Sequence, residues 1–327
     1  MAQIVVGVAA SHTPQLSSGV EWWENHGERD KGNPKLLGVD GEYHVYDELP
    51  TAAPEVLDQL KPEVYEAKYA RTEKGIQTLV QVLADAKPDV VVVIGDDQWE
   101  MFKDEGVPAF SLFHGEQLFD EELRDVNSLA KGIQAANWAA HGNGRSWHKT
   151  DGAFAEHITR SVSEADFDVH WFKEQRDDRT LGHAFTFPRY RLDLSPEIPI
   201  VPIFVNCYFP PNNPSAQRCF AFGQAVRAAI ESWPQDVRVA VVSSGGLSHF
   251  VVNEALDEQV LAGLRAGDWP SFGDLPRNQM RSGTAEILNW VVAAGILEHK
   301  KATVVDYVPG YRSPKGTGTG MGFAYWQ

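Results

Sequence analysis

Four histidines and two aspartates of this sequence stand where segments of strand or turn character end. They are His12 after residues 4–10, Asp96 and Asp97 after residues 90–95, His114 at the end of residues 108–114, His183 in residues 179–188 and His249 after residues 237–246. Ligands of an α/β sheet gather at the C-terminal ends of its strands. We therefore expect these six side chains to share one site.

Two histidines and one carboxylate form the ligand set of non-haem Fe(II) sites that keep open positions for substrate and oxygen. Such a site needs neutral imidazoles and an ionised carboxylate. His12 is suited to be one of the imidazoles. The carboxylate candidates are Asp96, Asp97 and Glu286, the last of which lies in the apolar stretch "GTAEILNWVVAAG". By spacing alone, Glu286 is equally well read as an exposed helix position.

The segments that would position these residues alternate between strand and helix. Continuous apolar runs at 4–10, 90–95, 198–206 and 237–246 are typical of strands in a sheet that is covered on both faces. Helical spacing occurs at 51–86, with breaks at its prolines, at 215–233, with Ser215 as N-cap, and at 283–297. This order predicts a three-layer α/β/α sandwich around a mixed, largely parallel sheet.

We expect residues 1–327 to form a single catalytic domain. The polar stretch at about 18–52 is interpreted as an ordered excursion or lid. The Gly-rich stretch at about 308–322 contains "GTGTG", but it lacks the strand before and the helix after it that a phosphate-binding loop requires. A nucleotide site is therefore not expected there.

Composition narrows the class of protein. The 327 residues carry a formal net charge of −16, and no basic patch is visible that would bind nucleic acid. Cys207 and Cys219 form no CxxC pattern, which favours reduced core thiols in a cytosolic protein. The N-terminus has no basic region of a signal peptide, and no apolar run reaches membrane-spanning length. We expect a cytoplasmic protein, with a homodimer as the default assembly.

Several motifs occur in an order that is similar to one enzyme family. They are "SHTP", "VIGDDQWEMF", "GHAFTFP", "FVNCYFPPNNPSAQRCFAFG", "GGLSHF" and "SGTAEILNW". Together they cover almost the whole chain and resemble the class III (LigB-type) extradiol ring-cleaving dioxygenases. The nearest branch is that of the protocatechuate 4,5-dioxygenase large subunit with the gallate and 3-O-methylgallate dioxygenases. The resemblance implies a LigB-like fold, Fe(II), O2 and a catechol-type aromatic substrate, with a small accessory subunit in some relatives.

The resemblance also implies roles for individual residues. His12 matches the first iron-ligand histidine and Glu286 the ligand glutamate. His249 matches the acid/base catalyst near the substrate hydroxyls, and His183 matches a second active-site histidine that holds substrate and oxygen. Family substrates usually carry a carboxylate, for which Arg281 and Arg312 are candidates by position. The Gly-rich tail after Pro309 falls where the family has a pocket-closing segment.

The sequence departs from the family at the second ligand histidine, where Gln98 and Trp99 stand. The indole nitrogen of Trp99 only donates, so it cannot bind a metal, whereas Gln98 has an amide oxygen. One explanation is that His114 reaches in from a neighbouring strand as a replacement ligand. A second is that Asp96, Asp97 or Gln98 completes an oxygen-rich site, for iron or another divalent metal. A third is that no metal binds.

The leading prediction is therefore an extradiol dioxygenase that acts on a carboxylated, lignin-derived or similar catechol with Fe(II) and O2. We expect Asp97, Trp99, Arg281 and Arg312 to contact the substrate. The alternative is a metal-independent or non-iron hydrolase, lyase or isomerase that uses His183 and His249 as acid and base. A non-catalytic partner subunit is disfavoured, because such a protein would not need to keep His12, His183, His249 and Glu286 together.

Overall fold

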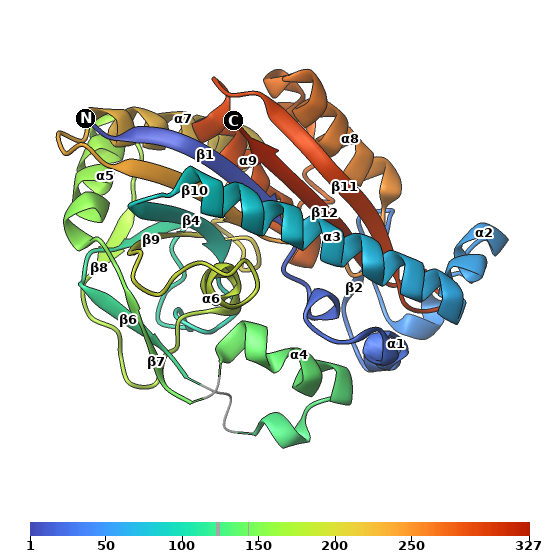
Figure 1. Cartoon of the computed structure of the whole chain (residues 1–327). Helices are drawn as coiled ribbons and strands as arrows, with labels where there is room; N and C mark the ends of the chain where they lie inside the picture. The colour runs from blue at the N-terminus through green and yellow to red at the C-terminus, as the bar shows by residue number, and fades with distance from the viewer. Residues whose placement is uncertain (122–124, 143) are drawn as a thin grey trace.

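An eight-stranded sheet forms the centre of the computed structural model, which describes residues 1–121, 125–142 and 144–327 (Figure 1). The strand order is β11-β12-β1-β10-β4-β9-β5-β8. These strands are β1 (Gln3–Ala10), β4 (Val90–Asp96), β5 (Phe110–Phe113), β8 (His170–Phe172), β9 (Ile200–Val205), β10 (Arg238–Ser244), β11 (Ala302–Tyr311) and β12 (Gly318–Trp326). Two short ribbons pair β2 (Leu36–Leu37) with β3 (Tyr43–His44), and β6 (Gln117–Asp120) with β7 (Ser146–Lys149).

The four central strands run parallel in the order β1-β10-β4-β9, and they correspond to the four apolar runs of the sequence. The sheet is mixed because β12 runs antiparallel to β1, and β5 runs antiparallel to β9. Every residue of β4 is buried, as expected for a strand covered on both faces. The predicted α/β fold with a mixed, largely parallel sheet is confirmed.

Helices cover both faces of this sheet. They are α1 (Trp23–Asp30), α2 (Pro54–Leu57), α3 (Pro62–Ala86), α4 (Lys131–His141), α5 (Gly152–Glu164), α6 (His183–Tyr190), α7 (Ala216–Ser232), α8 (Glu254–Ala266) and α9 (Ile287–Leu297). Short 3-10 turns are η1 (Pro14–Leu16), η2 (Val20–Trp22), η3 (Tyr46–Glu48), η4 (Asp58–Leu60), η5 (Val126–Ser128), η6 (Trp269–Asp274) and η7 (Ser282–Glu286). The hydroxyl of Ser215 accepts from the backbone N–H of Arg218, so Ser215 is the N-cap of α7, as predicted.

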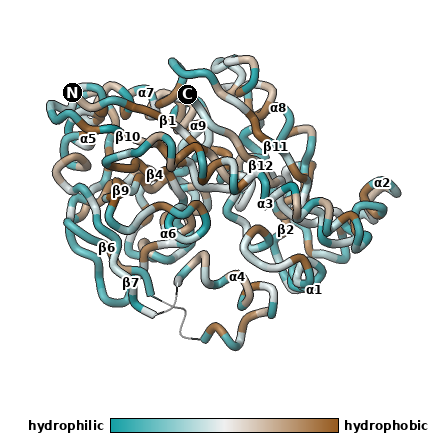
Figure 2. Tube along the Cα trace, in the orientation of Figure 1, coloured by the Kyte–Doolittle hydropathy of each residue, from teal (hydrophilic) through white to brown (hydrophobic). Residues whose placement is uncertain are grey.

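Two apolar layers lie on opposite faces of the sheet. One joins α5, α7, α8 and α9 to the strands, and the other joins α3 and α6 to them. The most hydrophobic stretches of the chain run through the central strands (Figure 2). In Figure 1, α3 crosses one face while α7 and α9 lie behind the sheet. No helix among the described residues is both long and apolar enough to cross a membrane.

Helices α7 and α9 pack closely against each other. A methyl group added at Gly223 would lie 2.2 Å from the carbonyl oxygen of Val292 and 2.9 Å from the Cα of Gly295. The helices therefore touch through their backbones at this point. Glu286 immediately precedes α9, so this contact helps to anchor the helix that follows it.

We predict that Gly223→Ala lowers the free energy of unfolding by about 1–3 kcal/mol, because the added methyl group must push α7 and α9 apart. Denaturant unfolding of the variant measures this loss. Gly273→Ala is the matched control, since a methyl group there meets no atom within 4 Å. Equal stabilities of the two variants would show that the helix contact tolerates the extra volume.

We also predict that acid destabilises the protein through His148 on β7. Its side chain is buried, and neither ring nitrogen has a hydrogen-bond partner among the described residues. Burial and the nearby Arg189 lower the pKa of His148 to about 4. The unfolded chain binds a proton below about pH 6.5, so the stability is complete above that pH and decreases by up to about 3 kcal/mol as the pH falls towards 4.

Denaturant unfolding at pH 7.5 and pH 4.5 tests this prediction on wild type and His148→Phe. The variant should lose less stability between the two pH values, because phenylalanine binds no proton. The same pH dependence in both proteins would contradict the assignment to His148.

Candidate active site

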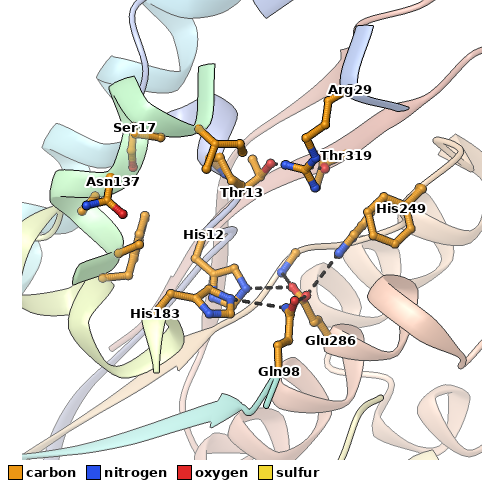
Figure 3. Close-up of a pocket in the computed structure, with 18 of the residues that line it drawn as sticks. His12, Thr13, Ser17, Arg29, Gln98, Asn137, His183, His249, Glu286 and Thr319 are labelled. Atoms are coloured by element: carbon orange, nitrogen blue, oxygen red, sulfur yellow. Dashed lines mark hydrogen bonds and ion pairs between the residues drawn. The ribbon is translucent and has the colours of Figure 1, made fainter. Parts of the chain in front are cut away.

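A pocket of about 220 Å³ opens at the C-terminal ends of the parallel strands (Figure 3). His12 follows β1, Gln98 follows β4, Tyr208 follows β9 and His249 follows β10. The first residue of α6, His183, and the last residue of η7, Glu286, complete this end of the pocket. Crossover connections thus bring together residues that lie up to 274 positions apart, which is the usual arrangement of sites in α/β sheets.

His12 and Glu286 point at the same small region. The Nε2 atom of His12 lies 3.0 Å from Oε2 of Glu286, yet it has no hydrogen-bond partner among the described residues because the geometry of this contact is unsuitable. The other ring nitrogen, Nδ1, lies 3.1 Å from the hydroxyl of Ser244. Ser244 therefore holds Nδ1, while Nε2 faces the pocket. A metal-binding histidine is usually held in this way.

Glu286 is 1 % exposed and is surrounded by donors. The backbone N–H of Gly246 donates to Oε2 at 2.5 Å, and the hydroxyl of Tyr208 donates to Oε1 at 2.5 Å. The Nε2 atom of His249 lies 3.2 Å from the same Oε1. Burial alone would raise the pKa of Glu286, but His249 and His12 hold that pKa well below its usual range. Glu286 is therefore ionised at neutral pH, as a metal ligand must be.

Gln98 turns its side-chain amide into the centre of the cluster. Its Nε2 atom lies 3.3 Å from Oδ2 of Asp96, 3.4 Å from Nε2 of His183 and 3.4 Å from Oε1 of Glu286. An amide can turn by 180° about its last bond, which presents the oxygen instead of the nitrogen to the same neighbours. In that orientation, Gln98 offers a neutral oxygen ligand beside His12 and Glu286.

Asp96 and His183 complete the charge pattern. Asp96 is fully buried, and burial together with the nearby Glu286 raises its pKa to about 6. His183 is paired through Nδ1 with Glu100. Burial alone would lower the pKa of His183, but the charge of Glu100 raises it to about 10. One oxygen of Asp96 and one ring nitrogen each of His12 and His183 lie within 4.8 Å of one another, a spacing that a metal ion could bridge.

The opposite end of the pocket is basic. Arg29 and Arg312 both line it. Figure 3 shows Arg29 beside Thr13 and Thr319 at this end. Arg312 makes two hydrogen bonds with the carboxylate of Asp30, at 2.7 and 2.9 Å. The side chain of Arg29 has no hydrogen bond or ion pair with any residue that the structure describes, and it is thus the guanidinium available to an anionic ligand.

We predict that Asp30→Ala lowers the free energy of unfolding by about 3–5 kcal/mol, because it leaves the buried Arg312 without a counter-charge. Denaturant unfolding measures the loss. Asp306→Ala is the control, since its partner Arg71 is half exposed and such surface pairs contribute at most about 1 kcal/mol. A loss as small as that of Asp306→Ala would show that Arg312 finds another partner or solvent.

The donor set fits a divalent metal of the iron type. His12 offers an unpartnered inward nitrogen, Glu286 an ionised carboxylate, and Gln98, once its amide is turned, an oxygen beside them. Compared with an iron site of two histidines and one carboxylate, this site has an amide in place of one imidazole. Glu286 contributes one formal negative charge. Asp96, a second carboxyl group with a pKa of about 6, lies behind it. The site therefore retains the charge that a divalent cation needs.

Comparison with known proteins assigns the chain to a family. Residues 51–322 match the family described as "Catalytic LigB subunit of aromatic ring-opening dioxygenase". The chain belongs to this family. Since the match covers most of the chain, the LigB resemblance predicted from the sequence motifs is confirmed.

Curated relatives from the same group of enzymes align with parts of the chain. Gallate dioxygenase of Pseudomonas putida is 33 % identical over 185 residues, which are 51 % of this chain and 50 % of that protein. The 2,3-dihydroxyphenylpropionate/2,3-dihydroxicinnamic acid 1,2-dioxygenase of Comamonas testosteroni is 25 % identical over 54 % of this chain and 48 % of its own length. The enzyme of the same name from Photorhabdus laumondii is 26 % identical over 64 % and 61 %. The chain thus spans about half to three fifths of the length of these relatives.

The structure of this LigB-family chain brings five of the predicted catalytic and metal-binding residues together at the pocket lining: His12, Gln98, His183, His249 and Glu286. Of the residues expected to contact substrate, Arg312 also lines it. Glu286 is not on an exposed helix face, as spacing alone allowed, but is buried at the last residue of η7.

His114 corrects the first explanation for the missing ligand. Because β5 runs antiparallel to β9, its C-terminal end lies at the edge of the sheet opposite to the pocket. There the Nε2 atom of His114 lies 2.8 Å from the hydroxyl of Thr159, and its ring stacks on Trp171 at 5.2 Å. His114 is absent from the lining of the pocket, so its position does not support a role as replacement ligand.

Three predicted substrate contacts also lie outside the pocket lining. Asp97 accepts from the backbone N–H groups of Met101 and Phe102, and so shapes the loop after β4. Trp99 has a left-handed backbone conformation, with φ of 67°, which turns its ring outwards onto Phe209. Arg281 donates to the carbonyl of Gly41 and lies over the ring of Tyr43.

The sequence reasoning missed three residues that matter here. Tyr208 donates to Glu286, Glu100 is paired with His183, and Arg29 lines the basic end. Tyr208 follows the predicted strand 198–206, so the rule that found the histidines would have found it too. Arg29 lies inside the polar stretch 18–52, where no spacing signal marks it.

Proposed function

We propose that this protein is an extradiol dioxygenase that opens a carboxylated catechol with Fe(II) and O2. The observation that carries the proposal is the convergence of His12, Gln98 and Glu286 on one point, with His249 and His183 beside it. Membership in the LigB family supports the same reaction class. The substrate of this protein and the identity of its metal are parts of the proposal.

His12, Glu286 and the amide oxygen of Gln98 would hold the metal, with Asp96 behind them. Bound there, Fe(II) supplies Lewis acidity towards the catechol hydroxyls and the redox capacity for reaction with oxygen. Tyr208 and the backbone N–H of Gly246 hold the Glu286 carboxylate in place. These two hydrogen bonds orient the metal-binding carboxylate and keep it from rotating out of the site.

His249 is suited to accept a proton from a substrate hydroxyl. Its Nδ1 atom lies 2.8 Å from the carbonyl oxygen of Leu247, which can only accept a hydrogen bond. Burial alone would lower the pKa of His249, but the charge of Glu286, which lies beside Nε2, raises it. Leu247 holds the proton on Nδ1, so Nε2 is the atom that exchanges a proton with the substrate. A positioned base of this kind typically accelerates a reaction by about 10²–10⁴-fold when the proton moves in the transition state.

His183 has a different role, because Glu100 keeps it protonated. Its charged ring lies with its centroid 4.6 Å from that of His12. It thus presents an N–H donor and a positive charge to an oxygen atom of substrate or dioxygen at the metal end. At the other end, Arg29 would bind the substrate carboxylate in the bidentate manner that guanidinium groups favour, and Arg312 would support it.

The test is metal content and oxygen uptake on protein purified without oxygen or chelator. Wild type should hold about one iron per chain and consume oxygen with 3,4-dihydroxybenzoate. Gln98→Ala should lose most of the iron, whereas Gln98→His should retain it. His114→Ala, a change to a buried histidine outside the pocket, is the matched control and should behave like wild type. Wild type that binds no iron and consumes no oxygen with any catechol would contradict the proposal.

A second candidate function rests on the two histidine–carboxylate pairs, His183 with Glu100 and His249 with Glu286. Such pairs could run acid/base chemistry without a metal, for example hydrolysis or isomerisation of a ring-cleavage product. This function predicts activity that survives chelators and the absence of oxygen. The homodimer stays a prediction, and the mass of the protein in solution tests it.

A further inference from the structure

Helix α4 forms one wall of the pocket. The pocket-lining residues on this helix are Ile133, Ala136, Asn137, Ala139, Ala140 and His141. Most of them follow the spacing of one helix face, at i, i+3, i+4, i+7 and i+8. Four of the six are apolar, as expected for a wall against an aromatic ring. Asn137 and His141 are the polar exceptions, and since they lie four residues apart, they are neighbours on that face.

Asn137 has no hydrogen-bonding role within the described part of the protein. It is 7 % exposed, and its amide makes no hydrogen bond to any residue that the structure describes. Figure 3 shows this side chain at the pocket wall near Ser17, on the far side of His12 and His183 from Glu286. The amide atoms of Asn137 are not among the fully buried polar atoms of the described residues, so they are open to the pocket, where a polar group of a ligand can bind them.

His141, which is 5 % exposed, is held by a buried carboxylate behind it. Its Nδ1 atom lies 3.1 Å from Oδ1 of Asp120, which is fully buried and does not line the pocket. The hydroxyl of Thr180 donates to the same oxygen at 3.1 Å. Hydrogen bonding to Asp120 favours the tautomer of His141 that carries its proton on Nδ1, and in this tautomer Nε2, at the opposite edge of the ring, is an acceptor.

We propose that Asn137 and His141 form a polar subsite that recognises a further ring hydroxyl of the substrate, besides the two hydroxyls at the metal end. This inference rests on the proposed aromatic-cleaving function and adds a substrate class to it. A hydroxyl group can donate to Nε2 of His141 and accept from the amide of Asn137 at once. A methoxy group cannot donate, and a hydrogen atom leaves both groups unsatisfied, so trihydroxylated rings are favoured over both.

Calorimetric titration without oxygen tests the subsite. The ligands are 3,4-dihydroxybenzoate, 3,4,5-trihydroxybenzoate and 3,4-dihydroxy-5-methoxybenzoate. Wild type should bind the trihydroxy compound roughly ten-fold more tightly than the other two, as expected for one to two hydrogen bonds. His141→Phe and Asn137→Leu should bring the three affinities to within about two-fold, mainly by weakening the trihydroxy compound.

Asp120→Asn separates positioning from simple structural support. The amide of asparagine can donate to Nδ1 of His141, which moves the ring proton to Nε2 and changes the acceptor into a donor. The discrimination between hydroxyl and methoxy should then disappear while the dihydroxy compound binds as before. Lys131→Ala, an exposed change on the same helix, is the control and should leave all three affinities unchanged.

Two results would overturn the inference. One is a wild type that binds the three ligands equally, and the other is a set of variants that weaken all three ligands to the same extent. Either result leaves the proposed function intact if 3,4-dihydroxybenzoate is still cleaved, because that compound lacks the third hydroxyl. Wild type that binds none of the three ligands would contradict both the subsite and the proposed substrate class.

Discussion

Glu286→Gln is expected to lose the bound iron and, with it, ring cleavage. The change keeps the shape of the side chain but removes the negative charge that two histidines, a backbone N–H and Tyr208 surround. A neutral amide cannot balance a divalent cation in a fully buried position. Because the metal provides several kcal/mol of transition-state stabilisation, we expect the turnover rate to fall by at least about a thousand-fold.

Iron content by mass spectrometry and oxygen uptake measure this effect. The matched control is Glu298→Gln, the same chemical change at the other end of α9, where the carboxylate pairs with Arg227 near the surface. The control should keep about one iron per chain and near-normal turnover. Full iron content in Glu286→Gln would show that other side chains hold the metal, and the ligand assignment would be wrong.

The second large effect is expected for His249→Asn. This change removes the only group that we assign as the base for the second hydroxyl, while Glu286 and His12 remain. The turnover rate should fall by about 10²–10⁴-fold, the usual contribution of a positioned base, and the iron content should stay the same. KM should change much less than the turnover rate, because the ring and carboxylate of the substrate keep their contacts.

The dependence of turnover on pH distinguishes a base from a structural residue. Wild type should show a limb that reports the ionisation of His249, and the variant should lose that limb. His299→Asn, a change at an exposed histidine after α9, is the control. Unchanged turnover in His249→Asn would assign the proton transfer to another group, and loss of iron would show that the residue holds the metal centre together.

These two variants separate the halves of the site. Glu286→Gln should remove both metal and activity, whereas His249→Asn should remove activity alone. If the metal-independent function were correct, chelator would leave wild type active, and the effect of His249→Asn would persist without oxygen. The same pair of variants therefore distinguishes the dioxygenase from the acid/base alternative.

Much of the fold was predictable from local sequence. Valine-rich runs without charges, such as 90–95, have no exposed face, so they must lie in a covered sheet, and the helical segments between them make the crossovers that parallel strands need. Polar residues directly after such strands must then meet at one edge. This reasoning placed His12 and His249 correctly at the pocket, and the motif around Glu286 added the carboxylate.

Strand direction and side-chain direction were decided only by the tertiary structure. His114 follows a strand as His12 does, but β5 pairs antiparallel with β9, so His114 lies at the opposite edge of the sheet. A four-residue apolar run carries no signal of its direction. Likewise, Gln98 and Trp99 are adjacent in sequence, and the left-handed backbone at Trp99 turns the tryptophan outwards while the glutamine lies at the centre.

The residues that tune the site also depended on the folded chain. Glu100, Tyr208 and Asp120 act through contacts with His183, Glu286 and His141, whose sequence separations are 83, 78 and 21 residues. Local patterns report how a segment buries its own apolar face, and they contain no information about which distant donor meets which acceptor. The sequence alone therefore determined the sheet, its functional edge and the residue types there, whereas long-range packing decided which side chains share the pocket.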